Sequence, residues 1–297
     1  MSTTPIKRIL CPVDLSETSG RALAYARMLA GWYDASVTAM QVIWLGIPPV
    51  AMSGVPAFIT DAQQDEFSQD LKRFVEDART TSAVDTVVVH GPIVQQILHQ
   101  AKTGHADLIV MGTHGLGGFE RLVLGSVTEK VLRKADCPVL TVPPAAAAAP
   151  RVPQPFKTIM CAMDFSPASQ KALNYALRLA EESGKRLILL HVIDTHANGY
   201  ITGGTGPEEN AERRQYEHLA QRELRLSVSD DARQRCECQE VTSFGRPHEQ
   251  IIQLAEAESA DLIVMGVHGR HAIDLGLFGS TTNQVVRNAT CPVLTVR

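Results

Sequence analysis

Short, continuous apolar runs alternate along this chain with longer segments whose apolar residues recur every three or four positions. In the N-terminal half this pattern predicts strands and helices in strict alternation, at 6–13, 17–31, 36–43, 61–82, 85–90, 93–104, 107–112, 126–134 and 138–142. In the C-terminal half it predicts the same alternation at 157–163, 167–183, 186–192, 207–230, 236–243, 247–258, 261–266, 280–288 and 292–296. Strands that are apolar along their whole length are typical of a parallel sheet covered on both faces.

The two halves also repeat each other in sequence. Residues 106–142 and 260–296 are identical at 21 of 37 positions with an offset of 154, and residues 9–30 match 159–180 with an offset of 150. Each half is therefore predicted to form an α/β domain with a doubly wound, five-stranded parallel sheet of order 3-2-1-4-5. Ligands bind such sheets where the winding direction reverses, which here lies between the first and fourth strands.

A segment rich in proline and alanine separates the halves. Residues 143–155 hold too many prolines for regular structure and predict a semi-rigid linker between domains at 1–142 and 156–297. The chain is 44% hydrophobic and 20% charged, as globular proteins are, and its net charge of −4 gives no electrostatic reason to expect nucleic acid or an acidic membrane. No signal-peptide or membrane-spanning run is evident, so a cytoplasmic location is expected.

Each half carries two glycine elements at a fixed spacing behind an apolar strand. The pattern G-x-x-G, nine residues, G-S gives Gly112, Gly115, Gly125 and Ser126 in the first half, and Gly266, Gly269, Gly279 and Ser280 in the second. Backbone amides at such turns and at helix N-termini converge on phosphate groups. A single G-x-x-G is equally compatible with a helix-entry turn, and either serine with a helix cap alone. The full spacing, found twice, predicts a phosphate-binding site in each half.

The first strand of each half ends at an aspartate that precedes a helix-capping serine. These pairs are Asp14 with Ser16, and Asp164 with Ser166. The aspartate is suited either to capping the next helix or to facing a ligand. In each half it is expected to share one crevice with the glycine that closes the fourth strand, namely Gly112 or Gly266.

These residues resemble the universal stress protein family in its ATP-binding branch. The resemblance rests on the segments CPVDLS and CAMDFS, DLIVMG, the two-part glycine pattern and CPVLTV, and it covers both halves nearly end to end. It implies two tandem domains of the adenine nucleotide alpha hydrolase-like fold that bind ATP, with magnesium or manganese held through the phosphates, and an unidentified protein partner. Single-domain relatives commonly dimerise through the last strand. The halves are therefore expected to pack as an intramolecular pseudo-dimer through 139–142 and 293–296, with a further homodimer left open.

The resemblance also places the nucleotide residue by residue. In the first half it implies binding by Pro12, Val13, Asp14, Val42, Met111, Gly112, Gly115, Gly125, Ser126, Val127 and Thr128, in order from adenine to terminal phosphate. In the second half the matching residues are Ala162, Met163, Asp164, Val192, Met265, Gly266, Gly269, Gly279, Ser280, Thr281 and Thr282. The loops between the glycine elements differ completely, so the two sites need not bind equally. Gly115→Val and Gly269→Val are each expected to abolish nucleotide binding in their own half and to leave the fold intact, because the new side chain would collide with phosphates and forbid a positive φ.

Other residues offer further chemistry. His268 and His271 with Asp274 form a possible metal site, but no additional ligand is spaced to complete it. Cys236 and Cys238 point to the same face of a predicted strand, which is compatible with a metal or redox role and also with a purely structural one. The six cysteines do not form the framework of a disulfide-rich protein.

The loops and turns leave alternatives of their own. His114 and His268 lie inside the glycine turns, where a histidine can touch phosphate or ribose or simply face solvent. The apolar stretch at 44–60 fits either a lid over the nucleotide or a loop packed on the other domain.

Groups for rapid ATP hydrolysis are missing from the pattern. No lysine follows the glycine turns and no paired acids stand ready to hold magnesium, while Arg121 and Arg270 are candidates for stabilising developing charge. The sequence therefore favours a nucleotide-loaded regulator of the stress response with at most slow ATP hydrolysis. The alternatives are a scaffold or interaction protein that does not depend on nucleotide, and an adenylate-forming or phosphotransfer enzyme.

Overall fold

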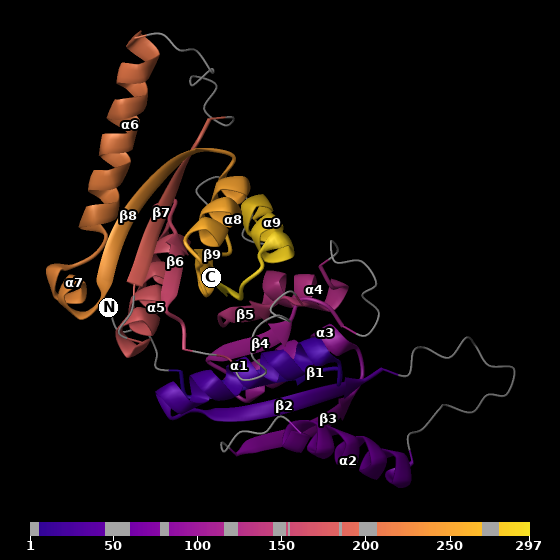
Figure 1. The fold of residues 1–297 in the computed structure, drawn as a ribbon. Coiled ribbons are helices and arrows are strands. Elements are labelled where there is room, and N and C mark those ends of the chain that lie inside the picture. The colour runs from indigo at the N-terminus through magenta and orange to yellow at the C-terminus, as the bar shows by residue number, and fades with distance from the viewer. Residues whose placement is uncertain are drawn as a thin grey trace, which may run out of the picture. The chain divides into compact units, whose positions relative to one another are not determined.

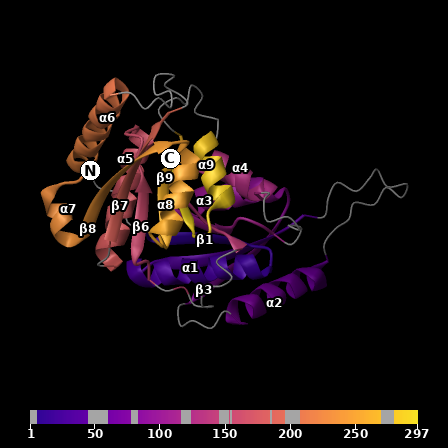
Figure 2. The same ribbon diagram turned by 45° about the horizontal axis from the view of Figure 1, so that its top comes forward.

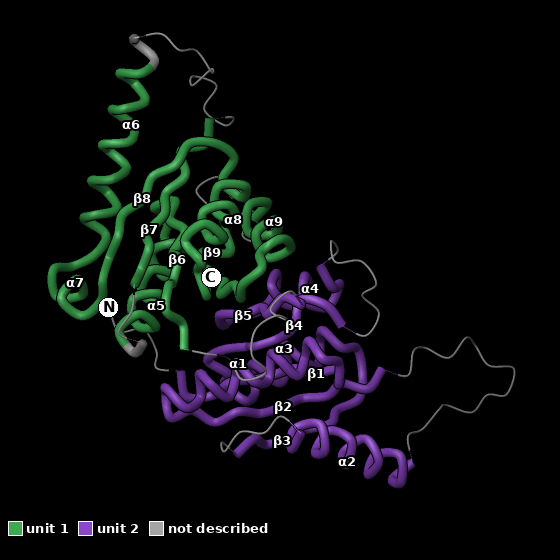
Figure 3. Tube along the Cα trace, viewed as in Figure 1, with its two compact units in different colours: residues 1–3, 154–297 green, residues 4–153 purple. Residues whose placement is uncertain are grey.

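The fold was analysed in a computed structural model (Figure 1, turned by 45° in Figure 2). The structure describes residues 6–44, 60–77, 83–115, 124–144, 153, 155–183, 186–195, 207–268 and 279–297. The chain divides into two compact units, one of residues 4–153 and one mainly of residues 154–297 (Figure 3). We call them the N-terminal unit (purple in Figure 3) and the C-terminal unit (green), and each is described by itself.

The N-terminal unit alternates strands and helices. They are β1 (Arg8–Val13), α1 (Glu17–Tyr33), β2 (Ser36–Ile43), α2 (Asp61–Asp77), β3 (Val84–His90), α3 (Ile93–Thr103), β4 (Leu108–Gly112), α4 (Ser126–Lys134) and β5 (Val139–Val142). All strand pairs are parallel, in the order β3-β2-β1-β4-β5. The predicted order is confirmed, and the winding direction reverses between β1 and β4. Residues 78–82, where the second helix was expected to continue, lie outside the described residues.

The C-terminal unit repeats this arrangement with one additional helix. Its elements are β6 (Thr158–Ala162), α5 (Pro167–Ser183), β7 (Arg186–Asp194), α6 (Pro207–Leu226), α7 (Asp230–Arg235), β8 (Glu237–Gly245), α8 (Pro247–Ala257), β9 (Leu262–Gly266), α9 (Ser280–Asn288) and β10 (Val293–Val296). Its strands are parallel in the order β8-β7-β6-β9-β10. The two units therefore share one topology.

The single helix predicted over 207–230 is wrong, because α6 ends at Leu226 and a separate helix follows. Ser229 caps α7, its hydroxyl oxygen accepting a hydrogen bond from the backbone N–H of Ala232 at 3.3 Å. Asp230 and Asp231 then occupy the first turn, where negative charge favours a new helix N-terminus. A local start signal thus interrupts a segment that is otherwise rich in helix-forming residues.

Helices cover both faces of each sheet. In the N-terminal unit α1 packs beside α2, and α3 beside α4, and right-handed crossovers put these two pairs on opposite faces. In the C-terminal unit α8 and α9 lie side by side in both views (Figures 1 and 2). The central strands between these layers are buried along almost their whole length, as their continuous apolar sequences predict. No described helix combines the length and the apolar character needed to cross a membrane.

The aspartate that opens each repeated DLIVMG segment fastens the fourth strand to the first. The Oδ2 atom of Asp107 accepts hydrogen bonds from the backbone N–H groups of Lys7 and Arg8, at 2.8 and 2.9 Å. Asp261 makes the same pair of bonds in the C-terminal unit. Both aspartates lie at the amino ends of the strands, whereas ligands of such sheets bind at the carboxyl ends. Their role is therefore structural.

Candidate functional site

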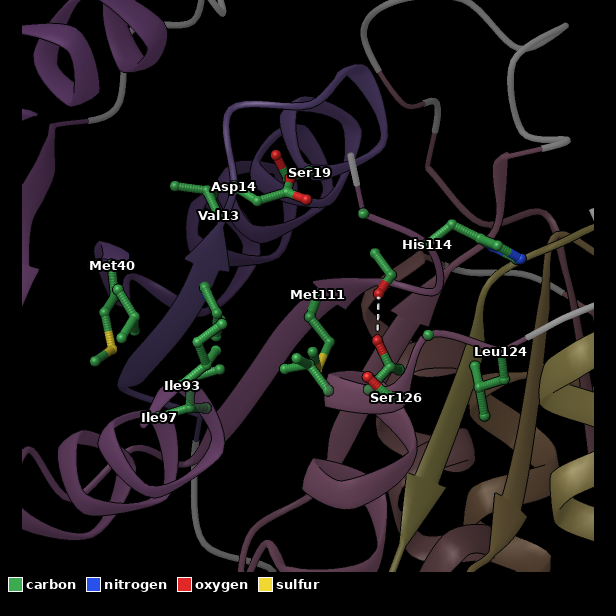
Figure 4. Close-up of a pocket in the computed structure, with 17 residues that line it drawn as sticks. Val13, Asp14, Ser19, Met40, Ile93, Ile97, Met111, His114, Leu124 and Ser126 are labelled. Atoms are coloured by element: carbon green, nitrogen blue, oxygen red, sulfur yellow. Dashed lines mark hydrogen bonds between the residues drawn. The ribbon is translucent and has the colours of Figure 1, made fainter. Parts of the chain in front are cut away.

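A cavity of about 750 Å³ lies in the N-terminal unit at the carboxyl ends of β1 and β4 (Figure 4). Doubly wound sheets bind their ligands at these carboxyl ends of the strands. Every residue assigned to the first half from the sequence lines it: Pro12, Val13, Asp14, Val42, Met111, Gly112, Gly115, Gly125, Ser126, Val127 and Thr128. The structure adds five lining residues that the sequence did not single out, Ser19, Met40, Ile93, Ile97 and Leu124, and also His114, for which the sequence left ligand contact and solvent exposure open.

The cavity has an apolar side and a polar side. In Figure 4, Met40, Ile93 and Ile97 gather on one side, and Ser126 lies on the other, beyond Met111. Ile93 and Ile97 come from the first turns of α3, where a spacing of four puts both side chains on one helix face. The shape therefore suits a ligand with a flat apolar part and a polar or charged tail.

The helix α4 begins at the polar side of this cavity without a capping side chain. Its N-cap is Gly125, which offers no side-chain hydrogen bond; α3 and α8 also begin without one, whereas Ser16 caps α1 and Ser229 caps α7. The first N–H groups of a helix have no intrahelical partner and carry the positive end of the helix dipole. An uncapped helix start that lines a cavity is suited to an anion. In the C-terminal unit α9 begins at Gly279 in the same way.

A threonine in each of these helices holds its first turn against the fourth strand. The Thr128 hydroxyl donates to the carbonyl oxygen of Gly112 at 2.9 Å, and the Thr282 hydroxyl to that of Gly266 at 3.0 Å. Both threonines are buried. Their hydroxyl protons are already donated to carbonyl oxygens of the strand. A phosphate could therefore accept hydrogen bonds from their backbone N–H groups but not from their hydroxyls.

Space, and not the sign of φ, explains the glycines of the motif. Among the described glycines, positive φ occurs at Gly91 and Gly245, with values of 130° and 138°, so the positive φ expected at Gly115 is wrong. A Cβ atom at Gly115 would instead lie 2.5 Å from Oδ2 of Asp14, and one at Gly112 would lie 2.8 Å from Cγ2 of Thr18. The turn is crowded by the start of α1, which leaves no room for side chains.

Asp14 lies at the cavity edge and also stabilises the turn into α1. Its Oδ1 atom accepts hydrogen bonds from the N–H of Ser16 at 3.1 Å and from the Ser16 hydroxyl at 2.5 Å. The next residue, Leu15, adopts a left-handed backbone with φ of 63°, and Phe165 does the same in the C-terminal unit with φ of 62°. The N-cap of α1 is Ser16 and not Asp14, so the capping role considered for this carboxylate is wrong: it orders the turn before the helix and can also face a ligand.

The C-terminal unit repeats the backbone of the site with different side chains. Asp164 accepts the N–H of Ser166 at 3.0 Å, as its counterpart does in the first unit. The His191 ring lies with Nδ1 2.7 Å from the carbonyl oxygen of Met163, and its centroid is 4.6 Å from that of Phe165. The equivalent positions in the N-terminal unit are Gln41, Val13 and Leu15. An aromatic contact between His191 on β7 and Phe165, which follows β6, thus distinguishes the second site from the first.

The remaining assigned residues of the second half take equivalent places. Ala162 ends β6 in register with Met265 on β9, Val192 follows His191 on β7, and Ser280 and Thr281 open α9. Several predictions fall outside the described residues: Gly269, Arg121, Arg270, His271, Asp274, most of the 44–60 loop and most of the linker. Within the residues that the structure describes, no group of three or more His, Cys, Asp or Glu side chains is placed to hold a metal.

Comparisons with known proteins agree with this fold. The universal stress protein family matches residues 5–143 and 155–297. The chain is similar to a universal stress protein of Mycolicibacterium smegmatis, with 28% identity over 97% of this chain and 96% of that protein. It is also similar to one of Methanocaldococcus jannaschii, with 36% identity over 46% of this chain and 81% of that protein. The crystal structure of a universal stress protein from Archaeoglobus fulgidus covers 99% of both chains, with a TM-score of 0.64 at 23% identity.

Proposed function

The chain belongs to the universal stress protein family through both of its halves, and on that basis we propose that it is a cytoplasmic, ATP-binding regulator of a stress response. The observation that carries the proposal is the uncapped start of α4 at the polar side of the cavity. A side-chain cap would compete with a ligand for the free N–H groups, whereas glycine leaves them available to phosphate.

The two sides of the cavity fit the two parts of an adenine nucleotide. Its volume of about 750 Å³ falls in the range of roughly 300–1,000 Å³ typical of small-molecule sites. We place the base beside Val42 and Ile93, which are partly exposed, and the phosphates at the backbone N–H groups of Ser126 and Val127. Asp14, between these ends, is suited to a hydroxyl of the ribose. The proposal extends to the C-terminal unit through Asp164 and the uncapped start of α9, with altered affinity because of the aromatic pair there.

The cavity supports binding better than catalysis. Asp14 and Ser126 are the hard oxygen donors that would complete the coordination of a magnesium or manganese ion held by the phosphates. Among the described residues that line the cavity there is no lysine, no arginine and no second carboxylate. Rapid phosphoryl transfer needs a cation on the developing charge and a group that positions water. We therefore propose a long-lived nucleotide complex with at most slow hydrolysis.

Mass spectrometry of ligand released from the purified protein, followed by titration with ATP, AMP and adenosine, tests this proposal. We expect ATP to be retained or to bind more tightly than AMP, and AMP more tightly than adenosine, because only phosphates reach α4. Equal affinities for the three ligands would mean that the helix start is not used. Absence of nucleotide together with absence of binding would favour a scaffold that works without nucleotide.

A further inference from the structure

Two thiols lie against each other at the start of β8 in the C-terminal unit. The Sγ atoms of Cys236 and Cys238 are 3.5 Å apart, and both residues are free cysteines. Cys236 has an extended backbone, with φ of −143° and ψ of 152°, and in extended chain residues two apart share one face. The pair lies at the amino end of β8, whereas the candidate nucleotide site of this unit lies at the carboxyl ends of β6 and β9, so the proposed function does not account for it.

We propose that Cys236 and Cys238 form a reversible redox site, which closes to an intramolecular disulfide through exchange with a low-molecular-weight disulfide. No other two of the six cysteines, all of which lie in described segments, are within hydrogen-bond distance of each other. Cys11 and Cys161 are fully buried inside the sheets. Contact between two sulfurs is therefore a property of this pair and not of the cysteines in general.

The backbone around the pair has room to adjust. A disulfide needs an S–S distance of about 2.05 Å, so the two sulfurs must draw closer than the 3.5 Å that separates them in the reduced protein. In its unit β8 is an edge strand, and its pairing with β7 begins at Glu237. Cys236 precedes that ladder and forms the C-cap of α7, a helix of 6 residues. Closure therefore shifts a strand end and a short helix instead of a core strand.

Exposure assigns different roles to the two thiols. Cys236 is only 6% exposed, whereas Cys238 is partly exposed. We therefore assign the first attack to Cys238 and the second to Cys236. Burial raises the pKa of both thiols, that of Cys238 to about 12; the contact between the two sulfurs raises the pKa of Cys238 further and lowers that of Cys236, and the positive charge of Arg233 lowers both. Because the thiolate is the attacking species, the reaction should be slow at neutral pH and accelerate as the pH rises.

The proposed chemistry balances in two exchange steps. The Cys238 thiolate attacks one sulfur of the small disulfide, which forms a mixed disulfide and releases one small thiolate. The Cys236 thiolate then attacks the Cys238 sulfur, which forms the protein disulfide and releases the second small thiolate. The two protons lost by the protein thiols end on the two released thiols, and the protein is oxidised by two electrons while the small disulfide is reduced. Excess dithiol reverses both steps.

Peptide mapping of the full-length protein tests the proposal directly. The protein is incubated with oxidised glutathione, quenched with acid, alkylated and digested with trypsin, which releases residues 236–270 as a peptide with no other cysteine. We expect this peptide to lose two hydrogens, to resist alkylation and to recover both thiols after dithiothreitol treatment. A peptide that remains doubly alkylated, or that keeps glutathione on either cysteine, would overturn the proposal.

Serine variants and pH separate this mechanism from nonspecific oxidation. Cys236→Ser is expected to accumulate glutathione on Cys238, and Cys238→Ser to react far more slowly, because its remaining thiol is buried. Cys137→Ser, which alters a cysteine outside the pair, should close the disulfide at the wild-type rate. The wild-type rate should rise about tenfold per pH unit between roughly pH 7 and 9, since the thiolate fraction does so below the pKa. A rate independent of pH, or equal rates for the two pair variants, would contradict the assigned roles.

Discussion

Aspartates at opposite ends of the strands in the N-terminal sheet show how position decides the role of a residue type. Asp14 lies at the carboxyl ends of the strands and lines the cavity. Asp107 lies at the amino ends and accepts hydrogen bonds from two backbone N–H groups. In the sequence both flank apolar strands, and only the order in which strands are assembled distinguishes them. Asp107 contributes to stability through two backbone donors, whereas Asp14 accepts hydrogen bonds from Ser16 and also lines the cavity.

Asp107→Ala should destabilise the N-terminal unit without changing its affinity for ATP. Removal of the carboxylate takes away the acceptor of the Lys7 and Arg8 N–H groups at an exposed position, where water can replace it, so the expected loss is about 0.5–1.5 kcal/mol of the free energy of unfolding. Urea denaturation measures the loss, and Asp85→Ala, at an exposed position of β3, is the matched control. Unchanged stability, or weakened ATP binding in a folded variant, would refute the structural role.

At the scale of elements, the site depends on the junction between β4 and α4. The Thr128 hydroxyl joins the first turn of the helix to the last residue of the strand, and Thr282 repeats the bond in the other unit. The bond orients the uncapped N–H groups toward the cavity. It therefore links the stability of the fold to the geometry of the proposed phosphate site.

Thr128→Val should weaken ATP binding in the N-terminal unit about threefold to tenfold, equivalent to roughly 1 kcal/mol. Valine keeps the shape of the side chain but leaves the Gly112 carbonyl without its donor, so the helix start loses its fixed orientation. Calorimetric titration measures the change. Thr128→Ser restores the hydroxyl and should recover most of the affinity. If serine and valine bind ATP equally well, the hydroxyl has no part in positioning the helix.

Most helices and strands could be predicted from the sequence, because the spacing of apolar residues and the repeat between the two halves indicate the same elements. The prediction was wrong where a local helix start competes with that spacing. The break at Ser227–Ser229 was missed because helix-forming residues continue on both sides of it. The left-handed backbone at Leu15 has no signature, since leucine does not favour it. Ile93 and Ile97 were missed as cavity residues because apolar residues four apart on a helix usually face a core. Cavity residues that the family resemblance did not assign could be identified only once the strands and helices were placed together in the fold.

At the scale of the whole molecule, the proposed regulator should keep ATP bound for a long time without hydrolysing it. Single-turnover measurements with magnesium or manganese should give hydrolysis well below the ~1 per second of ordinary enzymes. The reason is that the described lining of the cavity offers Asp14 as its one carboxylate and no lysine or arginine to stabilise developing charge. Limited proteolysis should differ with and without ATP. Fast turnover would contradict the regulator, and identical digestion patterns would remove the switch.

Packing of the two units as a pseudo-dimer through residues 139–142 and 293–296 stays a prediction from the sequence. An apolar strand at a sheet edge needs a partner, since unpaired backbone groups invite aggregation. Small-angle scattering of the full-length protein should give a single compact particle. A profile of two separated bodies that move independently would rule this packing out.

The central claim is that the crowded glycine turn beside α4 binds ATP, and a titration that counts sites tests it most directly. Gly115→Val is compared with wild type and with Gly31→Val, where a Cβ atom has no neighbour within 4 Å. If both units of the wild-type protein bind, Gly115→Val should lose one ATP per chain while the Gly31 variant keeps both. If only the N-terminal unit binds, Gly115→Val should lose all binding. A folded Gly115→Val protein with the wild-type number of sites and wild-type affinity would contradict the account.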